Sequence, residues 1–312
     1  MPARYQSIEE VRVVRLVTYD GPGRRLGALV GDHVIDVPGA VGSPGFPTTM
    51  EDLVEAGPAA LDELRGALER ADPGSHSIPE APLLAPLLPG SLRDFLAFED
   101  HVKAGAARRG ETVPEAWYEM PIYYKGNHRS VYGPDAEIPW PPFTEELDYE
   151  LELAAIVGGR GRDLEEAGAS DLILGYTLMN DWSARDIQRK EMAARLGPAK
   201  GKDFATSLGP CVVTADELDP RSLRLEARVD GEVWSRGTLG SARWTFPQMI
   251  AHVSRGEDVW PGDVYGSGTF GGGCGLDLGR FLWPGAVVEL AADGIGVLRN
   301  RVGGRAPRPE KR

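Results

Sequence analysis

Three acidic residues alternate with apolar ones near the middle of the chain of 312 residues. Asp148, Glu150 and Glu152 are separated by Tyr149 and Leu151, and this period of two predicts a strand with the three carboxylates on one face. Alternate residues of a strand lie about 6.6 to 7 Å apart at Cα, so two Glu side chains can converge on one ion. The pattern allows a cation site, but a solvated strand face is its commoner use.

The surroundings of these acids favour the cation site. No basic residue stands between Asp148 and Gly159, and the apolar run Ala154–Val157 predicts a buried strand end. Two carboxylates about 5 Å apart repel by roughly 3 kcal/mol at an effective dielectric near 20. A partly buried pair therefore needs a proton, a basic partner or a cation.

Other residues with chemical potential are ambiguous when taken alone. Asp181 precedes a helix-like stretch, where capping the helix is the commoner role of an Asp. The segment 94–104 predicts a helix that places Asp94 and His101 two turns apart on nearly the same face, but a lone His is usually solvated or structural. Lys202 precedes a predicted strand and could meet an anionic substrate, although a surface lysine is the default.

Two further stretches have the composition of binding elements. Residues 105–135 are rich in aromatic and basic side chains, which suits either a flexible wall of a site or a surface loop. The glycine-rich stretch 265–275 could bring backbone amides to an anion, but it lacks the Gly-Lys-Ser/Thr ending of a phosphate loop. Nucleotide binding is therefore not expected there.

Composition excludes several classes of protein. A net charge of −13 and an isoelectric point near 5.0 argue against a nucleic-acid partner. Cys211 and Cys274 lack Cys-x-x-Cys spacing, so neither a disulfide framework nor a zinc knuckle is expected. There is no run of 18 apolar residues and no apolar signal region, which predicts a soluble cytoplasmic protein without a membrane partner.

The 40 Gly and 25 Pro predict a loop-rich chain with many short strands. A strand at 11–19, a hairpin turn at Gly31-Asp32, and a capping box at 48–51 with a helix break at Gly57-Pro58 indicate a small N-terminal α+β domain. Prolines punctuate residues 78–90. The predicted domains are 1–85, a catalytic domain over 90–305, and a flexible tail over 306–312.

Taken together, residues 90 to 302 resemble the fumarylacetoacetate hydrolase family. The resemblance is carried by Leu147–Glu152, Met179–Gln188 and Ser267–Thr269. It implies a mixed α/β, β-rich fold, a mixed β-sandwich roll usually paired as a homodimer, and a role in aromatic catabolism. It also implies a metal site whose ligands come from a helix start, a strand and a turn: Asp94, Glu150, Glu152 and Asp181. Oxygen ligands suit Mg²⁺ or Mn²⁺, with Ca²⁺ possible, better than Zn²⁺.

The same resemblance assigns roles to the remaining candidates. His101 corresponds to the base that activates water, with Lys202 and Gln188 as further catalytic residues. The substrate-binding residues that it implies are Tyr124, Arg185 and Thr269. The expected partner is a small keto acid.

Three departures from the family pattern stand out. In the hydrolase that names the family, a Tyr follows the first metal-binding Asp by two residues and another follows the Gln by four, where this chain has Leu96 and Met192. A different substrate is therefore expected. That hydrolase also assists its His with a Glu between two leucines, and the nearest match here makes Asp277 the candidate partner of His101.

These observations lead to a ranked set of hypotheses. The first is hydrolytic cleavage of a carbon–carbon bond in a β-diketone acid, either fumarylacetoacetate-like or acylpyruvate-like, with His101 deprotonating water and Lys202 with the metal stabilising the departing enolate. The alternative is a metal-dependent decarboxylase, hydratase or isomerase of a small keto acid. A non-catalytic protein with a structural Ca²⁺ is a third hypothesis, against which the matches at His101, Lys202 and Gln188 count.

Overall fold

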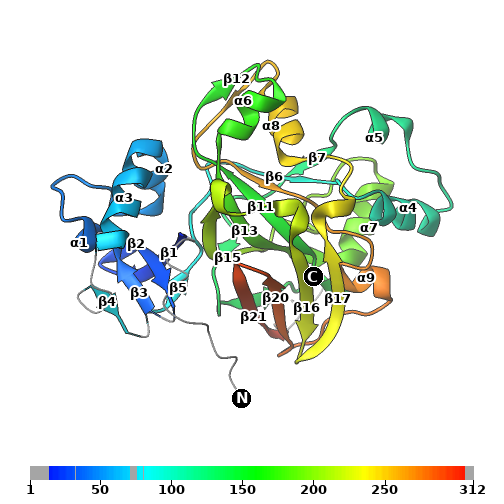
Figure 1. Ribbon diagram of the computed structural model, residues 1–312. Coiled ribbons are helices and arrows are strands. Elements are labelled where there is room, and N and C mark those ends of the chain that lie inside the picture. Colours follow the sequence, from blue (N-terminus) through cyan, green and yellow to red (C-terminus); the bar gives the residue numbers. More distant parts are fainter. Residues whose placement is uncertain (1–13, 32, 71–75, 80, 306–312) are drawn as a thin grey trace, which may run out of the picture.

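A computed structural model describes residues 14–31, 33–70, 76–79 and 81–305, and strands dominate its architecture (Figure 1). The larger sheet has the order β4 (Ser77–Ile78), β3 (His33–Asp36), β2 (Gly23–Val30), β1 (Arg15–Gly21), β15 (Thr206–Thr214), β13 (Ile173–Asp181), β11 (Leu151–Val157), β19 (Val264–Gly266), β6 (Leu92–Phe95), β7 (Tyr123–Lys125), with β5 (Leu83–Leu84) beside β1 and β8 (Val131–Tyr132) beside β15. The second sheet has the order β17 (Glu232–Thr238), β16 (Arg224–Val229), β20 (Val287–Ala292), β21 (Gly296–Arg305), β9 (Glu137–Trp140). Two short pairs are β10 (Leu147–Asp148) with β14 (Ser183–Ala184), and β12 (Gly161–Arg162) with β18 (Asp258–Val259).

The helices lie around these sheets (Figure 1). They are α1 (Val37–Val41), α2 (Met50–Ala56), α3 (Pro58–Arg70), α4 (Glu99–Arg108), α5 (Glu115–Glu119), α6 (Glu166–Asp171), α7 (Arg185–Ala193), α8 (Phe246–Ser254) and α9 (Gly275–Leu278), with 3₁₀ turns η1 (Ala215–Glu217), η2 (Pro220–Ser222) and η3 (Leu239–Ser241). Three strand pairs, β6 with β19, β8 with β15 and β9 with β21, are parallel, while the others are antiparallel. The sheets are therefore mixed, and the predicted mixed α/β, strand-rich fold class is confirmed.

Strand β11 lies in the interior with both faces covered. Leu151, Leu153 and Ala155 belong to the core that the two large sheets share with α8. Ala154 and Ile156 belong to a second apolar cluster that includes residues of β1, α2 and α3. Every residue of β11 is buried, so the solvated strand face that the acidic pattern allowed is wrong.

The N-terminal strands continue the larger sheet. Strand β1 pairs with β15 through Arg15 opposite Val213 and Leu16 opposite Val212. The Thr49 hydroxyl accepts from the Asp52 amide and caps helix α2. This N-cap is one residue later than Thr48, where the predicted capping box begins. The predicted break is present, since α2 ends at Ala56 and α3 begins at Pro58. The division at residues 85 to 90 stays a prediction.

The predicted helix over 94–104 is wrong in its first part. Residues Leu92–Phe95 form β6, which pairs with β19 on one side and β7 on the other, and all four residues are buried. Phe95 packs against Tyr123 and Tyr265, with ring centroids 5.0 and 5.8 Å away. Because this apolar packing and two neighbouring strands favour extended backbone, α4 begins only at Glu99.

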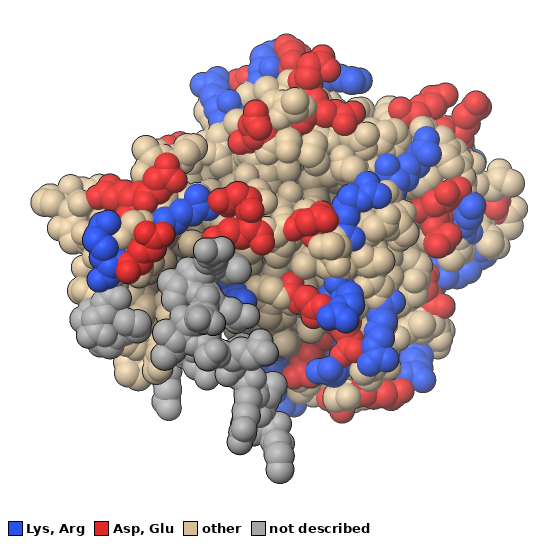
Figure 2. All heavy atoms as spheres, viewed as in Figure 1, with Lys and Arg blue, Asp and Glu red and all other residues tan. Residues whose placement is uncertain are grey.

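Residues 303–305 belong to β21, whereas the predicted flexible tail over 306–312 falls outside the described residues. Acidic and basic side chains are interspersed on the face shown in Figure 2. Among the helices that the structure describes, none has the length and apolar character needed to cross a membrane.

Candidate active site

Four buried acids converge at one end of the central strands. Asp94 lies on β6, Glu152 on β11 and Asp181 at the end of β13, while Glu150 lies just before β11. Each offers a carboxylate oxygen, and these four oxygens all lie within 4.8 Å of one another. The side chains come from neighbouring elements of one sheet, so the four residues predicted as metal ligands are brought together. Asp94 reaches the cluster from a strand rather than from the predicted helix start.

The oxygens of this cluster fit a cation. Glu152 Oε1 and Asp181 Oδ1 are buried and have no hydrogen-bond partner among the described residues. The amide of Gly268 donates to Asp94 Oδ1 and Glu152 Oε2, both at 3.1 Å. Buried carboxylate oxygens without a donor are costly, and a hard divalent cation satisfies several of them at once. The donor set therefore suits Mg²⁺, Mn²⁺ or Ca²⁺.

A glycine is required for that amide contact. Gly268 has a φ of +73°, and a Cβ added there would lie 2.0 Å from the carbonyl oxygen of Phe95. Any other residue would meet both the steric clash and the left-handed backbone. The glycine-rich stretch thus brings a backbone N–H to an anion, and the anion is a pair of protein carboxylates.

The acids divide into two electrostatic groups. Burial and the neighbouring Asp181 carboxylate raise the pKa of Asp94 well above its usual value, and burial together with Asp94 raises the pKa of Glu152 in the same way. Burial also acts on Glu150, but Arg185 and Lys202, assisted by His101, lower the pKa of Glu150 below its usual value. Burial and the neighbouring carboxylates therefore disfavour the ionised forms of Asp94, Glu152 and Asp181, and a bound cation would offset this by stabilising their carboxylates.

Lys202 is a buried ion-pair partner, so the default expectation of a surface lysine is wrong. Its Nζ donates to Glu150 Oε2 at 2.5 Å and also to Asp181 Oδ2. Burial opposes the charge of the ammonium, but Asp181 and Glu150 outweigh it and raise the pKa of Lys202 above its usual value. The Tyr124 hydroxyl donates to the same Asp181 oxygen at 2.8 Å. Lys202 and Tyr124 are thus placed against the acid cluster.

Arg185 links the cluster to Asp148 and Gln188. Its Nε donates to Asp148 Oδ2 at 2.8 Å, its Nη2 to Glu150 Oε1 at 2.7 Å and its Nη1 to Gln188 Oε1 at 2.9 Å. Asp148 also accepts from two backbone amides at the start of α9. Asp148 thus binds Arg185 and the start of α9 and does not belong to the four-acid cluster. Tyr149 and Glu150 lie between β10 and β11 and outside both strands, so the period of two is interrupted there. The substrate-binding role of Arg185 and the catalytic role of Gln188 stay predictions.

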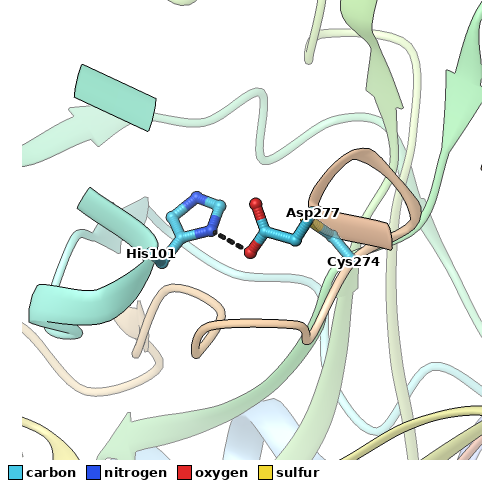
Figure 3. A group of neighbouring side chains, drawn as sticks. All are labelled: His101, Cys274 and Asp277. Atoms are coloured by element: carbon cyan, nitrogen blue, oxygen red, sulfur yellow. Dashed lines mark hydrogen bonds and ion pairs between the residues drawn. The ribbon is translucent and has the colours of Figure 1, made fainter. Parts of the chain in front are cut away.

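His101 and Asp277 form a hydrogen-bonded pair, as shown in Figure 3. His101 lies on α4 and Asp277 on α9, with 2.9 Å between His101 Nδ1 and Asp277 Oδ2. Burial opposes ionisation of Asp277, but the hydrogen bond and charge of His101 lower the pKa of Asp277 to about 2. An ionised Asp277 orients the imidazole with Nδ1–H toward itself and leaves Nε2 to accept a proton. The pairing expected of Asp277 is present.

Two residues that contact the site were given no role by the sequence. Arg108 Nη2 donates to Asp277 Oδ1 at 2.9 Å, and its spacing of seven residues from His101, two helical turns, was a usable signal. Asn180 Oδ1 accepts from the Glu150 amide at 3.0 Å, a cross-strand contact that no local pattern encodes.

The remaining candidates lie at or near this region. The buried hydroxyl of Thr269 donates to the carbonyl of Leu151 at 2.9 Å. The hydroxyl proton is therefore occupied by a backbone hydrogen bond, and a role of Thr269 in substrate binding stays a prediction. Leu96 and Met192, two of the three departures from the family pattern, have 40% and 43% of their surface exposed.

Comparison with known proteins identifies the family. The model described as "Fumarylacetoacetate (FAA) hydrolase C-terminal" matches residues 91–303. The chain is 30% identical over 300 residues to the mitochondrial oxaloacetate tautomerase fahd2 of Xenopus laevis, covering 94% of this chain and 90% of that protein.

Two solved structures have a similar fold. A fumarylacetoacetate hydrolase from Exiguobacterium antarcticum superposes with a TM-score of 0.75 at 28% identity, covering 94% of this chain and 100% of that one. A maleylpyruvate hydrolase from Sphingobium sp. SYK-6, solved with manganese(II) and pyruvate, has the same fold, with a TM-score of 0.71 at 24% identity and coverage of 93% and 98%. With the match over residues 91–303 and the acid cluster in place, the chain belongs to the fumarylacetoacetate hydrolase family.

Proposed function

We propose that this protein is a metal-dependent hydrolase that cleaves a carbon–carbon bond in a β-diketone acid such as an acylpyruvate. The observation that carries the proposal is the His101–Asp277 pair beside a buried four-acid cluster. An oriented imidazole is the usual general base for activating water. A purely structural cation site would have no use for it.

Asp94, Glu150, Glu152 and Asp181 would hold the cation, with Mg²⁺ or Mn²⁺ as the expected ion and Ca²⁺ as an alternative. When bound, such an ion supplies Lewis acidity toward the oxygens of the oxo acid. The manganese and pyruvate in the related maleylpyruvate hydrolase support this assignment.

His101 and Lys202 would carry out the proton and charge steps. With Nδ1–H directed at Asp277, His101 Nε2 removes a proton from water, and the resulting hydroxide attacks a carbonyl carbon of the substrate. Lys202 has three N–H donors, of which two face Glu150 and Asp181, so one is left for the substrate. That donor stabilises the negative charge on the enolate that departs when the carbon–carbon bond breaks.

A second candidate is tautomerisation of a small oxo acid, with decarboxylation or isomerisation as related outcomes. It is favoured by the full-length relatives that are named oxaloacetate tautomerases. The same residues would serve, because His101 would move a proton between carbon and solvent without attack by water. The two candidates differ in the fate of the carbon skeleton.

Product analysis tests the proposal. The purified protein with Mn²⁺ is given a panel of acylpyruvates and, separately, oxaloacetate, while ultraviolet absorbance is followed and products are identified by mass spectrometry. Hydrolysis yields two carbon fragments, decarboxylation yields CO₂, and tautomerisation conserves mass. Conserved mass across the whole panel would exclude hydrolysis, and full turnover by a His101→Ala variant would exclude His101 as the base.

Assembly and location belong to the same proposal. A homodimer acting on a small keto acid is expected from the family, and a cytoplasmic location from the sequence. Location stays a prediction, particularly because several animal relatives are named as mitochondrial proteins.

A further inference from the structure

We infer that His101, Cys274 and Asp277 form a second metal site, one that takes a softer cation such as Zn²⁺ and inhibits the enzyme when it is filled. The positions of the three side chains support binding of the cation, and inhibition follows if His101 has the role proposed above.

The three side chains are already gathered. Each offers one ligand atom, and these atoms all lie within 4.8 Å of one another. Cys274 is the N-cap residue of α9 and Asp277 is its third residue, so both belong to the first turn of one helix. His101 approaches from α4 on the other side, as Figure 3 shows. Small side-chain movements would bring the three atoms around one ion.

The donor set differs from that of the four-acid cluster. Nitrogen, sulfur and oxygen from His, Cys and Asp are ligands that Zn²⁺ accepts in tetrahedral sites. Thiolate and imidazole favour softer ions, whereas four carboxylates favour Mg²⁺, Mn²⁺ or Ca²⁺. The chain thus offers two neighbouring sites of different selectivity.

The charges at the site partly offset those of a divalent ion. On binding, the Cys274 thiol gives its proton to solvent, and the thiolate and the Asp277 carboxylate, together with the Arg108 guanidinium that pairs with Asp277, carry one net negative charge against the two positive charges of the ion. Arg108 donates to Asp277 Oδ1, while Oδ2 faces His101 and also accepts from the Gly272 amide at 3.0 Å. The carboxylate is therefore fixed with one oxygen directed at the site.

Filling this site would remove the proposed base. Coordination through His101 Nδ1 replaces the hydrogen bond to Asp277 and moves the ring proton to Nε2, which can then no longer accept a proton from water. Inhibition should be reversible, because a chelator that removes Zn²⁺ restores the hydrogen bond.

Cobalt absorption tests binding without reference to activity. The full-length protein is saturated with Mg²⁺ to fill the four-acid cluster and is then titrated with Co²⁺. A near-ultraviolet thiolate-to-cobalt charge-transfer band is expected, saturating at one ion per chain and disappearing when Zn²⁺ is added. Absence of the band in the wild-type protein would overturn the inference.

Cysteine variants assign the band, because the sequence contains only Cys211 and Cys274. Cys274→Ser should lose it, with Cys274→Ala as a second variant if the serine protein does not fold. Cys211→Ser is the matched control and should keep it, since Cys211 is equally buried on β15 and its Sγ donates to the Ile295 carbonyl. A band that persists in folded Cys274 variants would exclude the site.

Turnover then separates the two parts of the inference. With Mg²⁺ saturating, Zn²⁺ should inhibit the wild-type protein and the Cys211→Ser control alike, while Cys274→Ser should need about tenfold more Zn²⁺, a shift of about 1.4 kcal/mol. A cobalt band with no effect of Zn²⁺ on turnover would support the metal site and overturn the role of His101.

Discussion

Arg108 binds the carboxylate oxygen of Asp277 that His101 leaves available, so one half-buried Asp joins two residues of the same helix. Helix α4 has a single buried residue, Ala106. Its attachment to α9 therefore depends strongly on these two polar contacts.

Removing Arg108 should lower kcat more than it changes KM. An Arg108→Ala variant frees one oxygen of Asp277 and loosens the orientation of His101, with an expected loss of about tenfold in kcat, or about 1.4 kcal/mol. Arg108→Lys should recover part of it. Arg109→Ala is the control, because Arg109 pairs with exposed Glu111. Equal losses in the Arg108 and Arg109 variants would contradict a positioning role for Arg108.

Asp277 should make stability depend on pH in acid. Its pKa is lowered in the folded protein from 3.8 to about 2, so the unfolded chain binds the proton more tightly. The stabilising contribution is present above pH 4 and is lost as the pH falls toward 2. Urea unfolding between pH 5 and 2 should show a smaller acid loss for Asp277→Asn than for wild type. Parallel curves would contradict this assignment.

Gly268 should be required for both folding and metal binding. Gly268→Ala would place a methyl group 2.0 Å from the Phe95 carbonyl oxygen and disturb the amide that holds Asp94 and Glu152. Gly231→Ala is a matched control, since Gly231 also has a positive φ but a Cβ added there would meet no atom within 4 Å. The control should lose about 1 kcal/mol of stability. Gly268→Ala should lose more and should bind Mn²⁺ more weakly in calorimetry.

Metal removal should lower the melting temperature. Buried carboxylates such as Glu152 lose their counter-charge when a chelator strips the ion, so adding Mn²⁺ should restore stability. In Glu152→Gln this response should be largely abolished. Stabilisation by Ca²⁺ with no turnover of any oxo acid would favour the structural-site hypothesis instead. No response to any divalent ion would argue against the four-acid site itself.

The sequence predicted the chemistry of the site better than its local structure. The alternation around Glu150 and Glu152 alone favoured a solvated strand face, and the apolar run that follows favoured a buried cation site instead; all four acids of the cluster are at least 95% buried. Asp94 was misplaced on a helix because a short apolar run fits a buried strand as well as a helix. The partners of β6 lie far away in the chain, so no local pattern decides between them.

Long-range contacts account for the other differences. Lys202 looked like a surface residue because its partners, Glu150 and Asp181, precede it by 52 and 21 positions. Asp148 shares the sequence pattern of the other acids but is bound by Arg185. The resemblance to the family supplied what periodicity could not, namely which separate acids belong to one cluster.

The pairing of β1 with β15 makes the N-terminal region part of the sheet that carries Asp181. A chain cut between residues 85 and 90 would expose backbone donors and acceptors of β15 around Val212 and Val213. Those residues are apolar and fully buried. An isolated C-terminal portion would thus present an unpaired, apolar strand edge to other chains, and we expect it to self-associate.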